Sequence, residues 1–265
     1  MIVSQQNSSR HQTLIPVSAG ARTLEPFSPA NGICRQTLVP LPGEDSSVSS
    51  PPTLAALTPT LSLAAGATIN WTTQALALNN GNPASGQTVV WQTGSSITTS
   101  GPPSSTTNAS GIAAKSLSVG PLAEGQQAMS TACVNGTSQC VSFTALGARP
   151  EYAWLEAVSG TAQTLPASGT PGVITLRVRD MNGNPMAGGT VTLFQSLYAW
   201  TPPCPPHGRC AQAPLLATQT ATATSALDGT VSFAPASISG VATNLIALAV
   251  TGNAGALTIA VEQHP

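Results

Sequence analysis

One stretch of the sequence occurs twice, and this repeat limits what the chain can fold into. The first copy spans residues 80–90 and the second spans residues 182–192, and both begin with Asn-Gly-Asn-Pro. Their starts are 182 − 80 = 102 residues apart, which is about one domain length. Asn-Gly accepts the positive φ angles of a tight turn, and alternating strand residues follow it in both copies. The sequence therefore predicts two copies of one module.

A shorter echo follows in each half, Ser-Gly-Ile-Ala at residues 110–113 and Asp-Gly-Thr-Val at residues 228–231. The two motifs start 110 − 80 = 30 residues apart in the first module and 228 − 182 = 46 residues apart in the second. The second module therefore carries 16 extra residues, which we place around residues 197–210.

The composition excludes several classes of partner. The chain has 265 residues, room for two ordinary domains, and hydrophobic residues make up 41% of it. Charged residues make up only 6%, the net charge is −1, and Lys115 is the only lysine. We therefore expect no binding to nucleic acid or to anionic lipid, both of which need a basic surface. No run approaches the roughly 20 apolar residues that span a bilayer, so we expect no membrane insertion.

The cysteines indicate an oxidising, extracellular compartment. Four of the five form two close pairs, Cys133 with Cys140 and Cys204 with Cys210, as expected for disulfides that close short loops. Cys34 is left over and is a candidate for an intermolecular bridge. A hairpin loop centred on residues 136–137 places Cys133 directly opposite Cys140, at a Cβ separation that a disulfide can span. This bridge should contribute roughly 2 kcal/mol, the low end of the usual range, because the loop is short.

Short strand patterns separated by Gly, Pro and Asn predict an all-β fold of two sandwiches. The first module is predicted over residues 52–148 and the second over residues 149–265, with a joint at residues 146–150. The clearest strand is residues 172–180, in which Ile174, Leu176 and Val178 alternate with polar residues and should face the core. Other strands are expected at 60–63, 67–72, 88–91, 112–114, 128–133, 140–143, 152–157, 245–250 and 256–261.

Residues 1–51 differ from the rest of the chain. They contain three Thr-Leu-x-Pro segments, at residues 13–16, 23–26 and 37–40, and proline blocks both helices and central strands. One interpretation is an extended leader with little order. The other is an arm that adds edge strands to a neighbouring subunit, which its apolar content favours. The sequence leaves both open.

The second copy and its surroundings resemble a known family. Residues 180–191 are similar to the D-x-x-G-N-P-V-x-G-x-x-V core of bacterial Ig-like (Big-1) repeats of the invasin/intimin type, and residues 225–231 match a later turn of those repeats. The first module matches over residues 80–89 and 108–113, although Leu78-Asn79 replaces the usual acidic residue. The resemblance implies two tandem immunoglobulin-like β-sandwiches after an extended N-terminal segment. It also implies a place in a rigid rod, secreted or on the bacterial cell surface.

Few residues are candidates for catalysis. His11, His207 and His264 lack a nearby acid and nucleophile in sequence, and no G-x-S-x-G motif occurs, so we predict that the chain is not an enzyme.

Metal binding is also disfavoured. Cys204, His207 and Cys210 supply three metal ligands without a fourth, and a disulfide explains the same residues. Asp180 and Asp228 are at turns, where capping is favoured over calcium because acidic residues are sparse. We predict no metal and no cofactor.

The insertion in the second module is the predicted contact loop. It contains Tyr198, Trp200, His207 and Arg209 beside the Cys204–Cys210 pair, and rigid aromatic loops of this kind often bind partners. Alternatively, its aromatic residues cover their own sandwich.

The predicted function is a non-enzymatic extracellular spacer with structural or adhesive roles. Its partner would be a surface protein, a glycan or further copies of itself. The alternative is a subunit of an extracellular filament or particle, assembled through the N-terminal arm.

Overall fold

The computed structural model describes residues 51–166, 169–199, 213–236, 242–253 and 255–264. Within these ranges the chain forms β-strands and one short 3-10 helix, η1 (Pro150–Tyr152), so the predicted all-β fold is confirmed. Among the described residues, no helix has the length and apolar character needed to cross a membrane.

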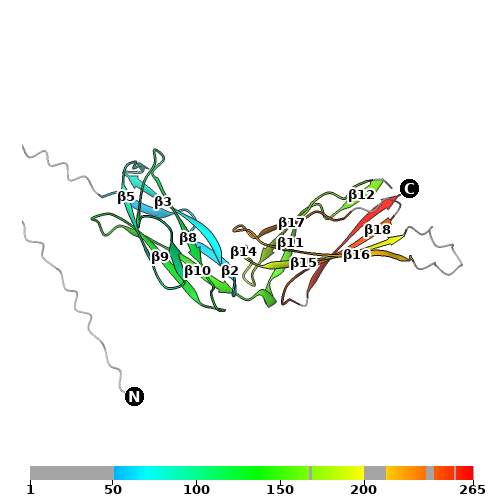
Figure 1. Ribbon diagram of the computed structural model, residues 1–265. Coiled ribbons are helices and arrows are strands. Elements are labelled where there is room, and N and C mark those ends of the chain that lie inside the picture. Colours follow the sequence, from blue (N-terminus) through cyan, green and yellow to red (C-terminus); the bar gives the residue numbers. More distant parts are fainter. Residues whose placement is uncertain (1–50, 167–168, 200–212, 237–241, 254, 265) are drawn as a thin grey trace, which may run out of the picture. The chain divides into compact units, whose positions relative to one another are not determined.

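The strands between Thr53 and Ala148, here called the first sandwich, form two sheets (Figure 1). One sheet has the order β1-β3-β8-β6, with β4 paired to β3: β1 (Thr53–Ala56), β3 (Ile69–Asn79), β8 (Ile112–Val119), β6 (Ile97–Thr99) and β4 (Asn82–Pro83). The other contains β2 (Thr60–Ala64), β10 (Cys140–Ala148), β9 (Gln127–Val134), β5 (Thr88–Thr93) and β7 (Ser104–Thr106). At one edge it also takes in β14 (Met186–Ala187), which comes later in the chain, so that its order is β14-β2-β10-β9-β5-β7.

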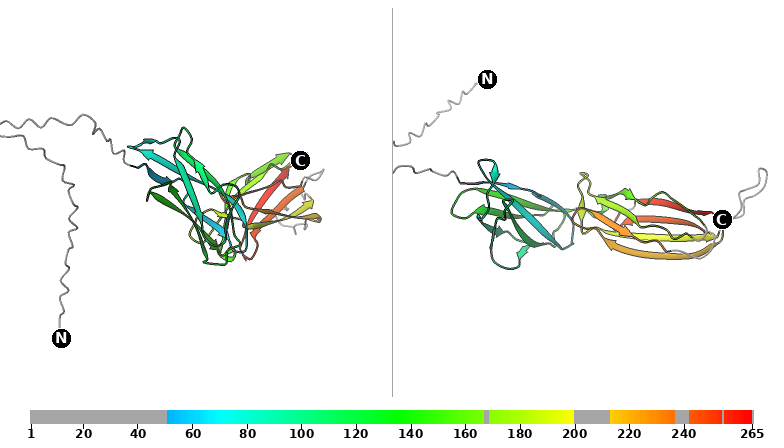
Figure 2. Two further views of the ribbon diagram at one scale, coloured as in Figure 1. Left: turned by 60° about the vertical axis from the view of Figure 1, so that its left-hand side comes forward. Right: turned by 90° about the horizontal axis from the view of Figure 1, so that it is seen from above.

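The strands between Trp154 and His264, here called the second sandwich, also form two sheets. The smaller has the order β11-β13-β17: β11 (Trp154–Ser159), β13 (Ile174–Arg179) and β17 (Thr230–Phe233). The larger has the order β12-β19-β18-β15-β16: β12 (Gln163–Pro166), β19 (Ala256–His264), β18 (Ala242–Val250), β15 (Thr190–Ala199) and β16 (Leu215–Thr224). In the right-hand view of Figure 2, the gold-orange β16 borders its sheet, with the yellow β15 beside it.

The strand order is that of the immunoglobulin fold. In the first sandwich β1-β3-β8-β6 corresponds to A-B-E-D, and β10-β9-β5 corresponds to G-F-C. The second sandwich repeats it, with β11-β13-β17 as A-B-E and β19-β18-β15 as G-F-C. The predicted tandem immunoglobulin-like sandwiches are therefore confirmed by the topology itself.

Each sandwich encloses its own hydrophobic cluster. The first is built around aromatic rings, with Phe143 lying 6.0 Å from Trp71 and 5.6 Å from Trp91 between ring centroids. The second is mainly aliphatic. Ile174 and Leu176 of β13 are fully buried there, as the alternation of that strand predicts.

The two echo motifs form the same turn. In the first sandwich, the Gly111 N–H donates to the carbonyl of Asn108, and the Asn108 N–H donates to the carbonyl of Ile112. In the second sandwich, the Gly229 N–H donates to the carbonyl of Ala226 in the same way. A Cβ on either glycine would lie 2.6 Å from a backbone oxygen of the neighbouring strand in the sheet, Ala77 of β3 or Val178 of β13, so both positions require glycine. This shared steric limit explains why the short motif recurs.

The last hairpin of the first sandwich has the expected register. Cys133 lies directly opposite Cys140 in the β9–β10 ladder, and the two are joined by a disulfide. The predicted pairing of these cysteines is confirmed.

The expected joint at residues 146–150 is partly wrong. Residues 146–148 belong to β10 and pair with β2, so the last strand continues through most of that segment. Tyr152, expected in a strand, lies in η1, and β11 begins at Trp154. Proline at the first position of η1 fixes a helical φ there, which ends the strand pattern.

Candidate functional site

Asp180 caps the second Asn-Gly-Asn-Pro turn with a buried carboxylate. Only 2% of the residue is exposed. Its Oδ1 accepts hydrogen bonds from the backbone N–H groups of Asn182 and Asn184, both at 2.9 Å. Its Oδ2 accepts from the Asn184 side chain at 3.2 Å and from the Ser62 hydroxyl at 2.9 Å. Both oxygens are thus occupied by protein donors, the arrangement of a capped turn rather than of a calcium ligand.

The Ser62 bond ties this turn to the first sandwich. Met186 and Ala187 of β14 pair in parallel with Ser62 and Leu63 of β2, and Ala187 is part of the first hydrophobic cluster. A Cβ on Gly188 would lie 2.7 Å from the Cβ of Ala67, so the backbones can approach only because this residue is glycine. The second copy of the repeated stretch therefore forms the contact between the two sandwiches.

An aromatic and charged cluster covers the outer face of the smaller sheet in the second sandwich. Trp154 is 47% exposed, and the Arg179 guanidinium lies 5.9 Å from its ring centroid, within cation–π range. Glu156 bonds Arg179 at 2.7 Å and lies 3.6 Å from Arg177. The register causes this grouping, because Trp154 lies opposite Arg179 and Glu156 lies opposite Arg177.

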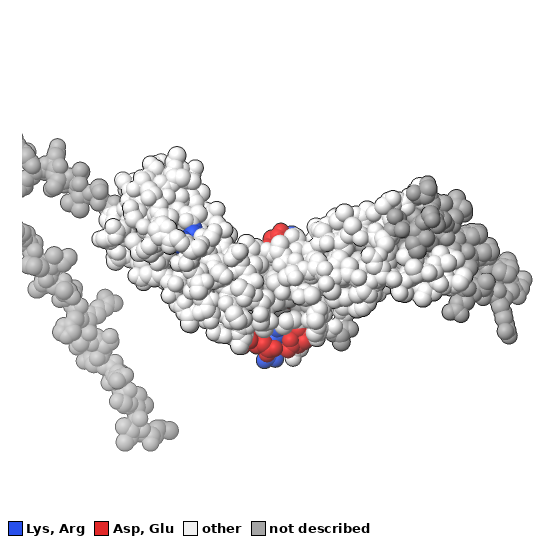
Figure 3. All heavy atoms as spheres, viewed as in Figure 1, with Lys and Arg blue, Asp and Glu red and all other residues white. Residues whose placement is uncertain are grey.

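This cluster stands out because charge is scarce elsewhere. In the space-filling view, nearly all of the visible surface that the described residues form is uncharged, with coloured atoms confined to a few small groups (Figure 3). A separate ion pair joins Arg149 to Glu124 at 2.9 Å, and the two side chains are 49% and 40% exposed. Exposed pairs of this kind stabilise little, so the Trp154 cluster, which adds a half-exposed aromatic ring, is the stronger candidate for recognition.

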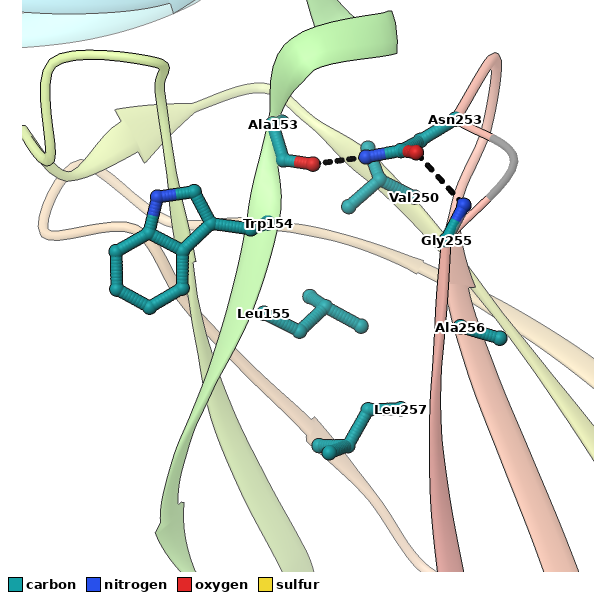
Figure 4. A pocket seen from close by; sticks show the side chains of 8 residues that line it. All are labelled: Ala153, Trp154, Leu155, Val250, Asn253, Gly255, Ala256 and Leu257. Atoms are coloured by element: carbon teal, nitrogen blue, oxygen red, sulfur yellow. Dashed lines mark hydrogen bonds between the residues drawn. The ribbon is translucent and has the colours of Figure 1, made fainter.

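A small pocket opens beside Trp154 (Figure 4). Its volume is about 220 Å³, and Leu155, Val250 and Leu257 give it apolar walls. The Asn253 side chain donates to the carbonyl of Ala153 and accepts from the Gly255 N–H, so its polar groups are engaged within the protein. The volume falls below the roughly 300 Å³ at which small-molecule sites begin, so an inserted side chain fits better than a cofactor.

Asp228 lies in the Asp-Gly-Thr-Val turn of the second sandwich, and its carboxylate caps that turn. The Thr230 hydroxyl donates to its carboxylate at 2.6 Å and the Thr230 N–H at 3.0 Å. These bonds, aided by the charge of Arg177, hold the pKa of Asp228 below its ordinary value, because they favour the ionised form.

Most of the predicted contact loop lies outside the described residues. This applies to Trp200, Cys204, His207, Arg209 and Cys210, and also to Cys34 and His11. Tyr198 is described. It lies near the end of β15, half-buried, opposite Thr243 of β18.

Within the described ranges, no group of three or more His, Cys, Asp or Glu side chains could hold a metal ion. His264 is in β19, which pairs with β18 and β12.

Sequence reasoning missed the role of Ser62 and the Trp154 cluster. Ser62 is 118 residues from Asp180 in the chain, and a serine in a short strand carries no signal of its own. For the cluster, a signal was present in the alternate arginines of residues 172–180, which mark an exposed face.

No protein-family model matches the sequence, and no curated protein matches it. Among solved structures, the D0-D1 domain of intimin is similar at 18% identity and a TM-score of 0.32, covering 80% of this chain and 97% of that chain. The Yersinia pseudotuberculosis adhesin InvE is similar at 19% identity and a TM-score of 0.30, covering 81% and 59%. The bacterial integrin-binding protein invasin is similar at 22% identity and a TM-score of 0.30, covering 81% and 40%. At these values the likeness carries no information about binding or activity.

Proposed function

We propose that the chain is an extracellular structural spacer whose two immunoglobulin-like sandwiches move as one body. The observation that carries the proposal is the contact between them. It combines the β2–β14 pairing with the buried Ser62–Asp180 hydrogen bond. A hydrogen bond to a buried carboxylate is stronger than one between neutral groups, so this contact resists hinge motion more than a flexible linker would.

The charge-poor surface and the disulfide support an extracellular setting for this spacer. An adhesive role rests on the exposed Trp154 cluster and on the predicted loop with Tyr198, Trp200, His207 and Arg209. Both belong to the second sandwich. Of the partners expected from the sequence, a surface protein or glycan would meet that part of the chain.

Backbone ¹⁵N relaxation by NMR tests the spacer role. We expect residues in both hydrophobic clusters to report one common rotational correlation time, because the sandwiches tumble together. Ser62→Ala should lower this coupling, while Ser116→Ala, which changes an exposed strand serine of β8, should leave it unchanged. Two separate correlation times in the unmodified protein would overturn the proposal.

A further inference from the structure

The border strands of the sheets differ sharply in how they are protected. Strand edges invite pairing with other chains, so proteins keep them short, bulged or interrupted by proline and charge. Among the described strands, every border strand but one follows this rule. β1, β6, β7, β14 and β17 have two to four residues, β11 carries Glu156 and a register shift after Ala157, and β12 ends at Pro166.

The exception is β16, the border strand of the larger sheet in the second sandwich. It has ten residues, Leu215–Thr224, with no proline and no charged side chain. It pairs with β15 on one side, and no described strand pairs with its other side.

The hydrogen bonds of Ser225, the residue after β16, show which backbone groups of the strand point away from β15. The Ser225 N–H donates to Gly189 at 2.9 Å and its carbonyl accepts from Gly188 at 3.0 Å, so both groups of Ser225 point toward β15. Backbone direction alternates along a strand. The N–H and C=O groups that point away from β15 are therefore those of Thr218, Thr220, Thr222 and Thr224.

The side chains alternate in the same way. Ala221 and Ala223 pack toward the core of the second sandwich, which places the four threonines on the outer face. Leu215 and Leu216 begin the strand and are 53% and 52% exposed. The edge is thus a row of β-branched threonines with apolar residues at one end, a surface well suited to a further strand.

We propose that β16 pairs antiparallel with β16 of a second copy of this chain, around a two-fold axis. With Ala221 on the axis, Thr218 lies opposite Thr224 of the other copy, and Thr220 lies opposite Thr222. Cross-strand threonine pairs are favourable, and an isologous contact brings identical surfaces together. Because this strand has no charge, two copies meet without the like-charge repulsion that protects other edges.

The length of the strand sets the expected strength. With Ala221 on the axis, residues 218–224 of the two copies overlap. These seven residues span roughly 24 Å, so an edge roughly 10 Å thick buries roughly 500 Å² over both copies. Stable interfaces usually bury at least about 1,200 Å². The dimer should therefore be weak and should dissociate on dilution. This inference is independent of the spacer role.

Amide exchange resolved by NMR tests the pairing directly. The amides of Thr220 and Thr222 should exchange about tenfold more slowly at about 1 mM protein than at about 10 μM, because dimerisation bonds them. The amide of Ala221, which points toward β15, should be protected at both concentrations. Fast exchange of the threonines throughout, or protection that does not depend on concentration, would overturn the proposal. The latter would mean that another segment covers the edge.

Sedimentation velocity of variants provides the second arm. Thr222→Pro removes only an outward N–H, so the sheet should survive while dimerisation is lost. Thr220→Lys introduces charge at the edge and should also leave a monomer. Thr258→Lys is the matched control, since Thr258 lies on the same outer face in the row Thr220–Phe194–Ala247–Thr258, three strands from the edge. Equal dimerisation of Thr220→Lys and Thr258→Lys would contradict the pairing.

Discussion

The two Asn-Gly-Asn-Pro turns have the same sequence but different structures. In the first sandwich, Asn79 pairs with Asn82, and Asn80 and Gly81 form a two-residue turn with φ angles of 50° and 81°. In the second, Arg179 bridges Pro185, so five residues form the loop, and Asp180 caps it from within. Ala77 donates to the carbonyl of Gly111, and Val178 donates to the carbonyl of Gly229, so Ala77 and Val178 are equivalent positions. Counting forward from them, Asp180 occupies the position of Asn79, and Met181 is an added residue.

This difference separates a solvent-facing turn from one that makes a contact. Asn79 and Asn80 are exposed, whereas Asp180 is buried against Ser62 of the first sandwich. One added residue and one carboxylate thus convert a hairpin turn into the contact between two sandwiches. A duplicated motif can keep its sequence signature while its copies take different roles.

The largest effect that we expect comes from Asp180→Ala. The substitution removes the acceptor of the buried Ser62 hydroxyl and of the Asn182 and Asn184 N–H groups, which should lower the free energy of unfolding by about 3 kcal/mol. Differential scanning calorimetry would measure the change in the transition of the second sandwich. Asn79→Ala, at the equivalent exposed position, should change stability by less than about 0.5 kcal/mol. Equal effects of the two substitutions would refute the contrast between the turns.

Removal of the disulfide is expected to have an intermediate effect. The closing hairpin of the first sandwich is bridged at Cys133 and Cys140, where the equivalent hairpin of the second has no cysteine. Because the bridge restricts the unfolded chain, Cys133→Ser with Cys140→Ser should lower the free energy of unfolding by about 2 kcal/mol. Calorimetry should show the loss in the first sandwich alone. A shift of both transitions would mean that the two cores unfold together.

The smallest effect should be a pH dependence that only the second echo turn has. The first turn is capped by the neutral Asn108, whose Oδ1 accepts from Ser110 and Ile112; the second is capped by Asp228. A carboxyl group with a lowered folded-state pKa contributes stability above its unfolded pKa of about 3.9 and loses it as pH falls through the folded pKa.

The unmodified protein should therefore have a higher free energy of unfolding than Asp228→Asn at neutral pH, and this difference should disappear below about pH 4. Melting temperatures measured across this range would reveal it. Asn108→Ala, which removes the neutral cap of the first turn, is the matched control and should show a difference that does not vary with pH. A constant difference for Asp228→Asn would exclude the carboxylate as its source.

Local chemistry made much of the fold predictable. The alternation in residues 172–180 predicts the buried face of β13, and the spacing of Cys133 and Cys140 predicts the register of β9 and β10. The candidate site was less accessible, because it depends on contacts between distant segments. Nothing near Ser62 signals that it meets Asp180, and the free edge of β16 follows only from knowing which strands its sheet contains.

The parallel pairing of terminal strands has a mechanical consequence. In each sandwich an early strand pairs with the last one, β2 with β10 over five residue pairs and β12 with β19 over four. Opposite pulls along such a pair act in shear, so the interstrand hydrogen bonds share the load rather than opening one at a time. Under tension, each sandwich would therefore resist unfolding until several hydrogen bonds break together. The first sandwich, which has the longer ladder, should withstand the greater force.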